Sequence, residues 1–312
     1  MINSVEQYLS ELKKELAGSD RATVQDALSD AEEYLRTALS IAAQADAKIS
    51  DAEALAPIIE KYGQPQEVAA AYKEIESRTP PAFGRPAQKE VKVPAAPLPA
   101  VPVVKDTRPF YAKFFGVFAE PRAWGSLFYL IFAMATGIIY FTWAVTGISV
   151  SAGLLILIIG LPIFGLFLLS VRGIALVEGR LIEALIGVRM PRRPLFSRKD
   201  IGWWQKVKKL FAERHTWTAI IYMILQMPLG IIYFTVIVTL IGAAAGIIAW
   251  PILAVSHGVP WFTIYPYEYY MSAWLIPIWV IVGILLLTST MHLVKHTGRL
   301  HAAYAKAMLV RE

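Results

Sequence analysis

One uncharged stretch decides the fold of this chain: Ala123–Val171, AWGSLFYLIFAMATGIIYFTWAVTGISVSAGLLILIIGLPIFGLFLLSV. Its 49 residues include no Lys, Arg, Asp or Glu. A helix needs about 20 apolar residues to cross the hydrocarbon core of a bilayer, so the stretch is long enough for two spans. The sequence predicts that a tight turn near Thr146–Ser151 joins them.

Two more uncharged runs follow, His215–Tyr267 and Tyr269–Val294. In the first run, residues 242–253 contain Pro251 and would reach only about 18 Å as a helix, which is too short to cross. These residues are either a re-entrant segment or an extension of the span before them. The chain is therefore predicted to cross the membrane four times, at about residues 124–146, 149–171, 217–240 and 272–294.

The composition is that of a membrane protein. Hydrophobic residues make up 56% of the 312 residues and charged residues 17%, whereas about a quarter of a soluble domain is charged. Residues 1–78 hold 8 Lys and Arg against 15 Asp and Glu, and residues 79–312 hold 22 against 9. An acidic soluble part therefore precedes a basic membrane part. The absence of cysteine excludes disulfides, thiol nucleophiles and iron–sulfur clusters.

Charge sets the predicted orientation of the spans. Residues 172–214 hold eleven Lys and Arg against four Asp and Glu, whereas the 254–271 loop has no Lys or Arg and one acidic residue, Glu268. Loops rich in Lys and Arg stay in the cytoplasm, so the first loop is predicted inside and the second outside. Met1–Glu15 has no apolar core and is not a signal peptide. We expect a multi-pass protein of the cell (cytoplasmic) membrane, with both termini in the cytoplasm.

The acidic N-terminal part is predicted to be a small cytoplasmic domain of four helices, so the whole chain is predicted to be all-α. Apolar residues recur at helical spacing through each segment, and start and stop signals flank the segments. Ser4 with Gln7, and Ser50 with Glu53, are candidate capping boxes. The predicted helices cover about residues 5–16, 20–44, 50–62 and 65–75, with Gly18 and Gly63 as stops.

This order of elements, closing with Tyr62-Gly63-Gln64-Pro65-Gln66-Glu67-Val68-Ala69, resembles the HAAS domain, a small helical signalling module. HAAS domains are often encoded beside PadR-like helix-turn-helix regulators or fused to membrane segments. The resemblance implies a PadR-like regulator as the cytoplasmic partner of residues 1–78.

An acidic run on the second helix has no His or Gly-rich loop beside it. We interpret this run as a solvated helix face rather than a metal or catalytic site: Asp26, Asp30, Glu32 and Glu33.

A proline-rich linker separates the two parts. Residues 79–109 hold eight prolines among 31 positions, interleaved with Ala, Val and Lys. This composition favours an extended polyproline conformation, which would reach about 95 Å if fully extended. Residues 1–78 carry a net charge of −7 and residues 172–214 a net charge of +7. We therefore predict that the acidic domain docks on the basic loop through salt-sensitive contacts.

The membrane part contains an internal repeat. Shifted by 93 residues, Phe110–Thr146 aligns with Trp203–Thr239, and Gly137–Thr142 is identical to Gly230–Thr235. We interpret the two predicted hairpins as duplicated copies. Both copies begin on the cytoplasmic side, so they are predicted to be related by an axis along the membrane normal.

Each copy of the repeat opens with an amphipathic segment. In the second copy, Trp203 and Trp204 lie opposite Lys206, Lys208 and Lys209. This pattern predicts a helix in the inner membrane interface whose basic residues bind anionic lipid. Nucleic acid is the weaker alternative, because the aromatic face belongs in the bilayer surface.

Three features resemble the sensor domain found at the N-terminus of some bacterial histidine kinases. They are the doubled hairpin with a Trp after its interfacial helix, the stretch Pro228–Phe234 and the heptapeptide Leu185–Pro191, LIGVRMP. The resemblance covers about residues 108–305 and implies a sensor role, without identifying ligand residues. Since no kinase module follows, the output is expected to leave through residues 1–78 or the cytoplasmic loops.

No motif in the chain predicts catalysis, a cofactor or a metal site. His292 and His296 share one helix face, but two ligands do not make a metal site, and Lys295 beside them repels a cation. There is no Gly-rich phosphate loop and no Ser, His and Asp set. The predicted spans have no charged residue in their interior, which disfavours a transporter. Their main polar groups are predicted to bond between helices: Thr142, Thr235 and Gln226.

The predicted outer loop holds seven aromatic residues within fourteen positions: Trp261, Phe262, Tyr265, Tyr267, Tyr269, Tyr270 and Trp274. One interpretation is a lid or groove for an amphiphilic or cationic ligand, lined by Trp261, Tyr265, Tyr267 and Tyr270. The alternative is an ordinary aromatic belt at the bilayer surface. Both interpretations stay open at the level of sequence.

The sequence supports two functions. The favoured hypothesis is a non-enzymatic membrane signalling protein that couples an envelope or lipid-borne cue to a cytoplasmic partner through residues 1–78. The alternative is a membrane subunit of a transport or envelope-assembly complex, whose N-terminal domain docks a kinase or an ATPase. The expected surroundings are the lipid bilayer and anionic lipids, without direct nucleic-acid binding. Oligomerisation is compatible with both functions.

Overall fold

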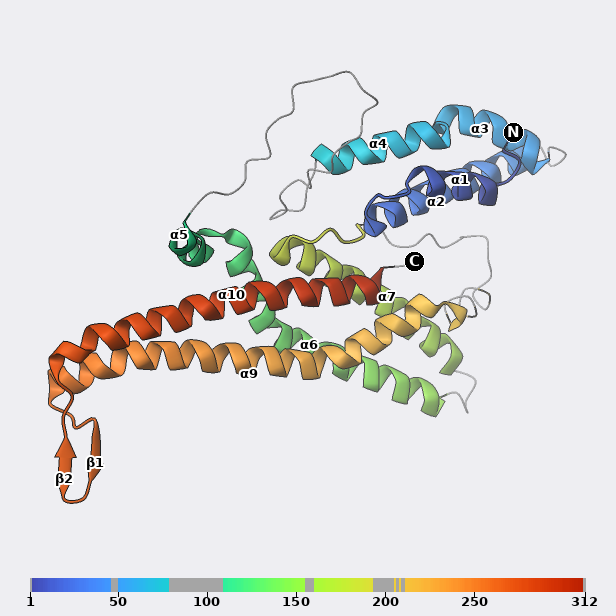
Figure 1. Ribbon diagram of the computed structural model, residues 1–312. Coiled ribbons are helices and arrows are strands. Elements are labelled where there is room, and N and C mark those ends of the chain that lie inside the picture. Colours follow the sequence, from blue (N-terminus) through green and yellow to red (C-terminus); the bar gives the residue numbers. More distant parts are fainter. Residues whose placement is uncertain are drawn as a thin grey trace, which may run out of the picture. The chain divides into compact units, whose positions relative to one another are not determined.

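The computed structural model describes residues 2–45, 50–78, 109–154, 160–192, 205, 208 and 211–310 (Figure 1). Helices account for nearly all of these residues, so the fold class is all-α as predicted. The predicted linker lies outside the described residues, except for Pro109. The chain divides into two compact units. Unit 1 comprises Met1–Ala87, Ile139–Leu225 and His301–Glu312, and unit 2 comprises Gln88–Ile138 and Gln226–Leu300.

The N-terminal domain has four helices, α1 Val5–Glu15, α2 Arg21–Ala45, α3 Asp51–Tyr62 and α4 Pro65–Arg78. Ser50 and Glu53 form the predicted capping box: the Ser50 hydroxyl accepts the Glu53 N–H, and the Glu53 carboxylate accepts the Ser50 N–H, both at 3.3 Å. The hydroxyl and the N–H of Ser50 together lower the pKa of Glu53. Gly18 and Gly63 follow α1 and α3 with φ of +83° and +115°, a region that favours glycine.

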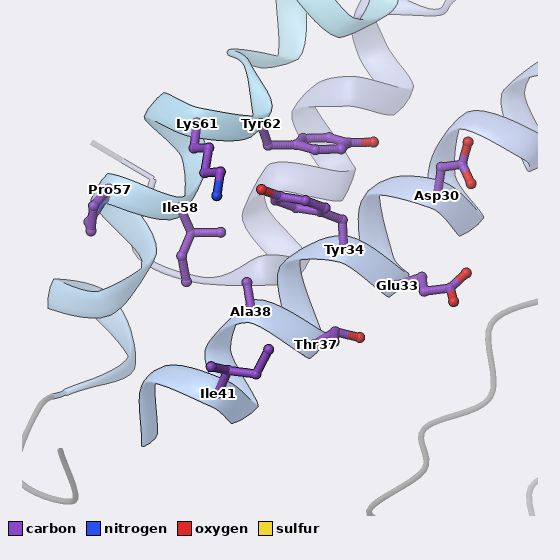
Figure 2. A pocket seen from close by; sticks show the side chains of 10 residues that line it. All are labelled: Asp30, Glu33, Tyr34, Thr37, Ala38, Ile41, Pro57, Ile58, Lys61 and Tyr62. Carbon is purple, nitrogen blue, oxygen red and sulfur yellow. The ribbon is translucent and has the colours of Figure 1, made fainter. Parts of the chain in front are cut away.

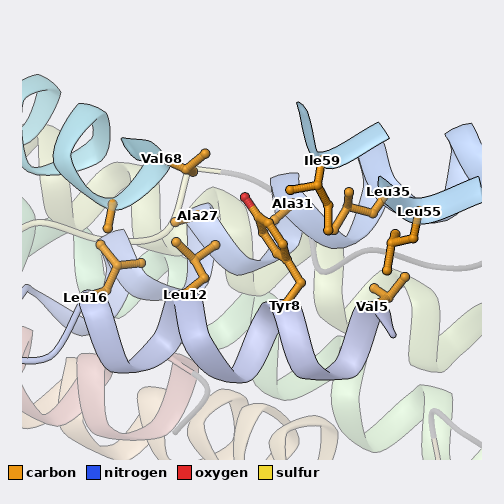
Figure 3. Packing of buried hydrophobic residues seen from close by; sticks show 11 residues of the cluster. Val5, Tyr8, Leu12, Leu16, Ala27, Ala31, Leu35, Leu55, Ile59 and Val68 are labelled. Carbon is orange, nitrogen blue, oxygen red and sulfur yellow. The ribbon is translucent and has the colours of Figure 1, made fainter. Parts of the chain in front are cut away.

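The core of this domain forms where α1 packs against the other helices. Figure 3 shows the apolar side chains of α1 pointing toward those of α2 and α3. Tyr8 is fully buried, and its hydroxyl donates to the carbonyl oxygen of Gly63 at 2.7 Å. Burial raises the pKa of Tyr8. The buried residues of this core are Val5, Tyr8, Leu12, Leu16, Ala27, Ala31, Leu35, Leu55, Ile59, Val68 and Ala69.

Four further helices are long and apolar enough to cross a membrane. They are α6 Pro121–Leu154, α7 Gly160–Ile186, α9 Arg214–His257 and, after the short turn η3 Ala273–Leu275, α10 Ile276–Leu309. α6, α9 and α10 contain all or most of one predicted span each, α7 contains residues 160–171 of the predicted span 149–171, and together the four helices fit a multi-pass membrane protein. The helices end later than the predicted spans, at Leu154, Ile186, His257 and Leu309, and α7 begins later, at Gly160.

The turn predicted near Thr146–Ser151 is wrong. α6 continues through these residues to Leu154, and α7 begins at Gly160. The segment has no proline, and Gly147 is a packing position, because a Cβ there would lie 2.2 Å from the ring of Phe167. A small residue that lets two helices approach closely has the same appearance in a sequence as a turn residue.

Residues 242–253 extend the third span. α9 runs from Arg214 to His257 without a break, with Pro228 and Pro251 inside it. A proline removes one helical hydrogen bond and bends the helix, which packed membrane helices tolerate. At 1.5 Å per residue, the 44 residues of α9 measure about 66 Å, roughly twice the hydrocarbon core. α9 must therefore tilt strongly or project beyond the core.

In unit 2, α6 and α9 cross at two glycines. A Cβ on Gly137 would lie 2.6 Å from the carbonyl oxygen of Gln226, and a Cβ on Gly230 would lie 2.4 Å from that of Ala133. The contact is reciprocal, since Gly230 and Gln226 stand 93 residues after Gly137 and Ala133. Glycine is needed at both positions, because any side chain would separate the two backbones.

Alanine at Gly230 is expected to destabilise the protein. The added Cβ would overlap the Ala133 carbonyl, and overpacking of this kind costs about 1–3 kcal/mol. The matched control is Gly242→Ala in the same helix, where a Cβ would meet nothing within 4 Å. Thermal unfolding of the two variants in detergent micelles measures the difference. Equal melting temperatures would contradict the glycine crossing.

The lead-in to α6 packs on α10 in unit 2. It consists of α5 Phe110–Phe115 and the short turn η1 Gly116–Ala119. The ring of His292 stacks on that of Phe114, and its Nε2 lies 2.9 Å from the Phe114 carbonyl oxygen. Lys295 pairs with Glu120 one turn further along. Among the residues that the structure describes, no group of three or more His, Cys, Asp and Glu is placed to hold a metal.

Candidate functional site

The chain turns back sharply where α7 ends, in unit 1. Gly187 has a φ of +78° and donates its N–H to the carbonyl oxygen of Ile182 at 3.3 Å, which closes the helix end. The fully buried Met190 then packs on Gly179, where an added Cβ would lie 3.4 Å from that of Met190. We call residues 187–192 the hook. It contains most of the heptapeptide Leu185–Pro191 that carries the family resemblance.

Two arginines of the hook bind Glu183 of α7. Arg189 Nη1 and Arg192 Nη2 lie 3.2 and 2.7 Å from Glu183 Oε1. The Glu183 side chain is only 8% exposed, and hydrogen bonds between charged groups are about twice as strong as neutral ones. Arg180 Nη2 also donates to the Arg192 carbonyl oxygen at 3.1 Å. These contacts fix the hook to the end of α7.

The same hook binds Asp26 of α2. Arg189 Nη2 lies 3.2 Å from Asp26 Oδ2, and the Arg192 N–H donates to both carboxylate oxygens, at 2.8 and 3.0 Å. Asp26 is only 4% exposed. A carboxylate this deeply buried needs such partners, because leaving it unpaired costs about 3–5 kcal/mol. Within unit 1, the hook therefore ties the N-terminal domain to α7.

The predicted solvated face of α2 is wrong at Asp26. Thr23 and Ser29 on the same helix are also buried, whereas Glu33 is exposed. Asp30 accepts a hydrogen bond from the Tyr72 hydroxyl. Helical periodicity identifies the apolar face of α2, but it cannot show that a segment about 160 residues later covers part of the polar face.

A second charged contact lies at the start of α2. Lys306, near the end of α10, pairs with Asp20. The Asp20 carboxylate also accepts the Ala22 N–H at 2.8 Å, which makes Asp20 the N-cap of α2. Two acidic residues of α2 and its N-cap therefore contact basic residues of the membrane part: Asp20 contacts Lys306, and Asp26 contacts Arg189.

The hook and Lys306 lie within the range of a known family. A family model described as Putative sensor matches residues 129–309, which is more than half of the chain. This chain belongs to that family. No curated protein and no solved structure matches the chain. The matched range, called the sensor domain from here on, includes all of α7, α9 and α10 and excludes α1–α4.

The sensor domain also contains a buried hydrogen-bond network around Glu178 of α7. Glu178 is 1% exposed. Its Oε2 accepts the hydroxyl of Tyr140 and its Oε1 that of Tyr222, both at 2.8 Å. His301 Nε2 lies 3.1 Å from the Tyr222 oxygen, and since the one hydroxyl proton of Tyr222 is used for Glu178, the histidine is the donor. Residues of α6, α7, α9 and α10 therefore meet in one network.

Sequence reasoning missed this network because it takes the uncharged run as the limit of each span. Glu178 follows the end of that run at Val171 and has the appearance of a loop charge, but α7 continues to Ile186. The predicted polar contacts between helices are wrong. Thr142 and Thr235 are exposed, and the buried Gln226 amide has no hydrogen-bond partner among the described residues. The tyrosines that do bond resemble ordinary apolar residues in the sequence.

The predicted outer loop forms a two-stranded hairpin in unit 2, with β1 Phe262–Ile264 antiparallel to β2 Tyr267–Tyr269. Three of the four predicted ligand residues, Tyr265, Tyr267 and Tyr270, are 95%, 67% and 59% exposed. The fourth, Trp261, packs against Trp279 of α10, with ring centroids 5.3 Å apart. The hairpin thus carries the three tyrosines on its surface, and a pocket formed by them stays a prediction.

The predicted lipid-binding helix lies mostly outside the described residues. Four of its residues fall there: Trp203, Trp204, Lys206 and Lys209. Lys208 is described and exposed. After this helix, Trp217 Nε1 donates to the Phe211 carbonyl oxygen at 2.8 Å, and Trp124 Nε1 donates to that of Phe118 at the same distance. The two lead-ins, 93 residues apart, therefore end in the same local contact.

An open groove of about 820 Å³ lies between α2 and α3 in the N-terminal domain (Figure 2). Tyr34 and Tyr62 stack beside it, with ring centroids 4.6 Å apart. Figure 2 shows Asp30 and Glu33 on the α2 side, and Ile58 with Lys61 on the α3 side. The groove uses the part of α2 that follows Asp26, so the hook and the groove occupy different stretches of one helix.

Proposed function

We propose that this chain is a non-enzymatic membrane sensor. Its sensor domain detects an envelope or lipid-borne cue, and its N-terminal domain relays the cue to a cytoplasmic partner. The observation that carries the proposal is the buried Asp26, which is bound by Arg189 and Arg192 of the sensor domain. Any movement of the hook changes the environment of Asp26. The membrane part therefore has a direct mechanical route to the soluble domain.

The Glu178 network supports the same route. Glu178 and Glu183 both lie on α7, so the helix that carries the network also carries the hook. Packed helices have discrete arrangements rather than continuous ones. A shift of α6 or α9 that breaks a tyrosine hydrogen bond to Glu178 would displace α7, and the hook would move with it.

We propose a HAAS-type role for the N-terminal domain, with a PadR-like regulator as its partner. The four helices and the turn at Gly63 support this assignment. We also propose that the two hairpins arose by duplication. The reciprocal contacts of Gly137 and Gly230 support that origin, as do the matching hydrogen bonds of Trp124 and Trp217.

The proposed location is the bacterial cytoplasmic membrane, with both termini inside. The basic residues of the hook support this orientation by the positive-inside rule. Reporter fusions after Pro191 and after Glu312 are expected to report cytoplasm, and a fusion near Tyr265 is expected to report the outside. An outside signal at the C-terminus would contradict the four-span orientation.

The sensor function is tested by a distance within unit 1. Because the chain has no cysteine, the exposed positions Glu60 and Ala303 can each be changed to Cys and carry unique spin labels. We expect a narrow distance distribution in phosphatidylcholine nanodiscs. It should broaden on addition of dodecyltrimethylammonium, a cationic amphiphile, or of 30% phosphatidylglycerol. Identical distributions in all three conditions would contradict a sensor of the bilayer.

The hairpin is the proposed entry point of the cue, and the same labels test it. Tyr265→Ser with Tyr267→Ser removes two exposed rings without touching the packed Trp261. We expect this variant to lose the response to dodecyltrimethylammonium and to keep the narrow starting distribution. The matched control is Thr263→Ser on the same hairpin. A full response in the tyrosine variant would leave the hairpin as an aromatic belt.

A further inference from the structure

We infer that the face of α2 bound by the hook is also the surface by which the N-terminal domain binds its partner. The partner segment would present what the hook presents: an arginine side chain and, three residues later, a free backbone N–H. This inference rests on the proposed function and names the chemistry of the partner. The hook then acts as an internal competitor that occupies the surface until the cue moves it.

The groups by which the hook binds Asp26 are common to many peptides. Among the described residues of the hook, the backbone N–H of Arg192 donates to both oxygens of Asp26, and the side chain of Arg189 donates to one of them. A backbone N–H is available in any peptide that lacks proline at that position. A segment of another protein with one suitably placed arginine could therefore make the same three bonds.

Charge complementarity favours a basic partner segment. Asp26 belongs to a domain of net charge −7 and lies about one turn and a half from the N-cap Asp20. A buried carboxylate that loses partners is unfavourable, so a new donor that replaces the hydrogen bonds from Arg189 and Arg192 would stabilise Asp26.

Hook and partner exclude each other because they use the same carboxylate oxygens. A segment tethered in the same chain acts at an effective concentration on the order of 1 mM. If the hook and the partner segment bind Asp26 about equally well, with dissociation constants of about 10 µM, the closed hook weakens partner binding by roughly 100-fold. Release of the hook would restore that affinity without any change in the partner.

A labelled peptide with the sequence of residues 186–193, IGVRMPRR, serves as the probe. It is titrated by fluorescence anisotropy against the full chain in nanodiscs. In the variant Arg189→Glu/Arg192→Glu, the hook is repelled by Asp26, and we expect the peptide to bind at least 10-fold tighter than it binds the wild type. A peptide with Ser in place of its first arginine should lose that gain.

Two further variants keep the test decisive. Adding Asp26→Asn to the released variant should remove peptide binding, whereas adding Glu33→Gln, an exposed acidic residue of the same helix, should not. Arg189→Ser is a milder release variant in case the double substitution perturbs folding, which the helical circular dichroism of each sample reports. Equal affinity for wild type and released variants, or binding that persists without the Asp26 carboxylate, would overturn the inference.

The label pair at positions 60 and 303 separates this inference from the proposed function. If Arg189→Glu/Arg192→Glu broadens the distance distribution and the peptide still does not bind, the hook is a tether and no competitor, and only the inference fails. If the distribution stays narrow, the hook does not hold the N-terminal domain. That result would contradict the proposed function itself, because the membrane part would then have no route through the hook to the N-terminal domain.

Discussion

Glu178→Leu is expected to destabilise the sensor domain by about 3–5 kcal/mol. Leucine is close to glutamate in size, so the loss comes from the hydroxyls of Tyr140 and Tyr222, which would lose the carboxylate that accepts them. Each buried hydroxyl left unsatisfied costs about 1–3 kcal/mol. The bond between Tyr222 and His301 would also lose its polarising partner. Unfolding in mixed detergent micelles, followed by circular dichroism, measures the change.

A double-mutant cycle identifies the cause of that loss. Tyr140→Phe in the Glu178→Leu background removes one unsatisfied hydroxyl and should restore about 1–3 kcal/mol, although the same change in the wild type should destabilise. Glu178→Gln keeps one acceptor oxygen and should cost less than leucine. The matched control is Val177→Leu, an exposed neighbour on α7. Additive losses in the cycle would show that the contributions of Tyr140 and Glu178 do not depend on each other.

The features that the sequence predicts correctly are those set by local patterns. The apolar spacing that begins at Val5 identifies the core face of α1, and Ser50 with Glu53 fixes the start of α3. The number of long apolar helices follows from the uncharged runs, because a span must be apolar over about 20 residues.

The site could not be predicted in the same way, because it depends on contacts between distant residues. Asp26 and Arg189 are 163 residues apart, and each reads in the sequence as an ordinary surface charge. Glu178 likewise needs tyrosines from two other helices before its burial becomes favourable. The one local signal was the heptapeptide Leu185–Pro191. The family resemblance identified this heptapeptide, but its sequence has no helical or strand periodicity from which its conformation could be predicted. The positive φ of Gly187 and the burial of Met190, which define the hook, are visible only in the structure.

Asp26→Arg is expected to release the N-terminal domain from the hook. The new arginine would face Arg189, and the N–H of Arg192 would lose its acceptor. Removing one partner of a buried ion pair costs about 3–5 kcal/mol, which shifts the docking equilibrium by roughly 100-fold or more. The distance distribution between labels at positions 60 and 303 should therefore become broad. Its matched control is Glu33→Arg, which makes the same charge change at an exposed position of the same helix and should leave the distribution narrow.

The charge swap Asp26→Arg/Arg189→Asp tests whether the contact itself holds the domain. The new arginine can pair with the aspartate at position 189 and with Glu183, but the Arg192 N–H stays without its acceptor, so we expect partial return of the narrow distribution.

Salt separates this contact from the general attraction between the −7 domain and the +7 loop. Exposed charges are screened within about 8–10 Å at physiological ionic strength, whereas a buried pair is screened much less. A narrow wild-type distribution that survives 0.5 M salt favours the buried contact. Release by salt alone, or by Glu33→Arg, would show that long-range attraction holds the domain and that Asp26 is incidental.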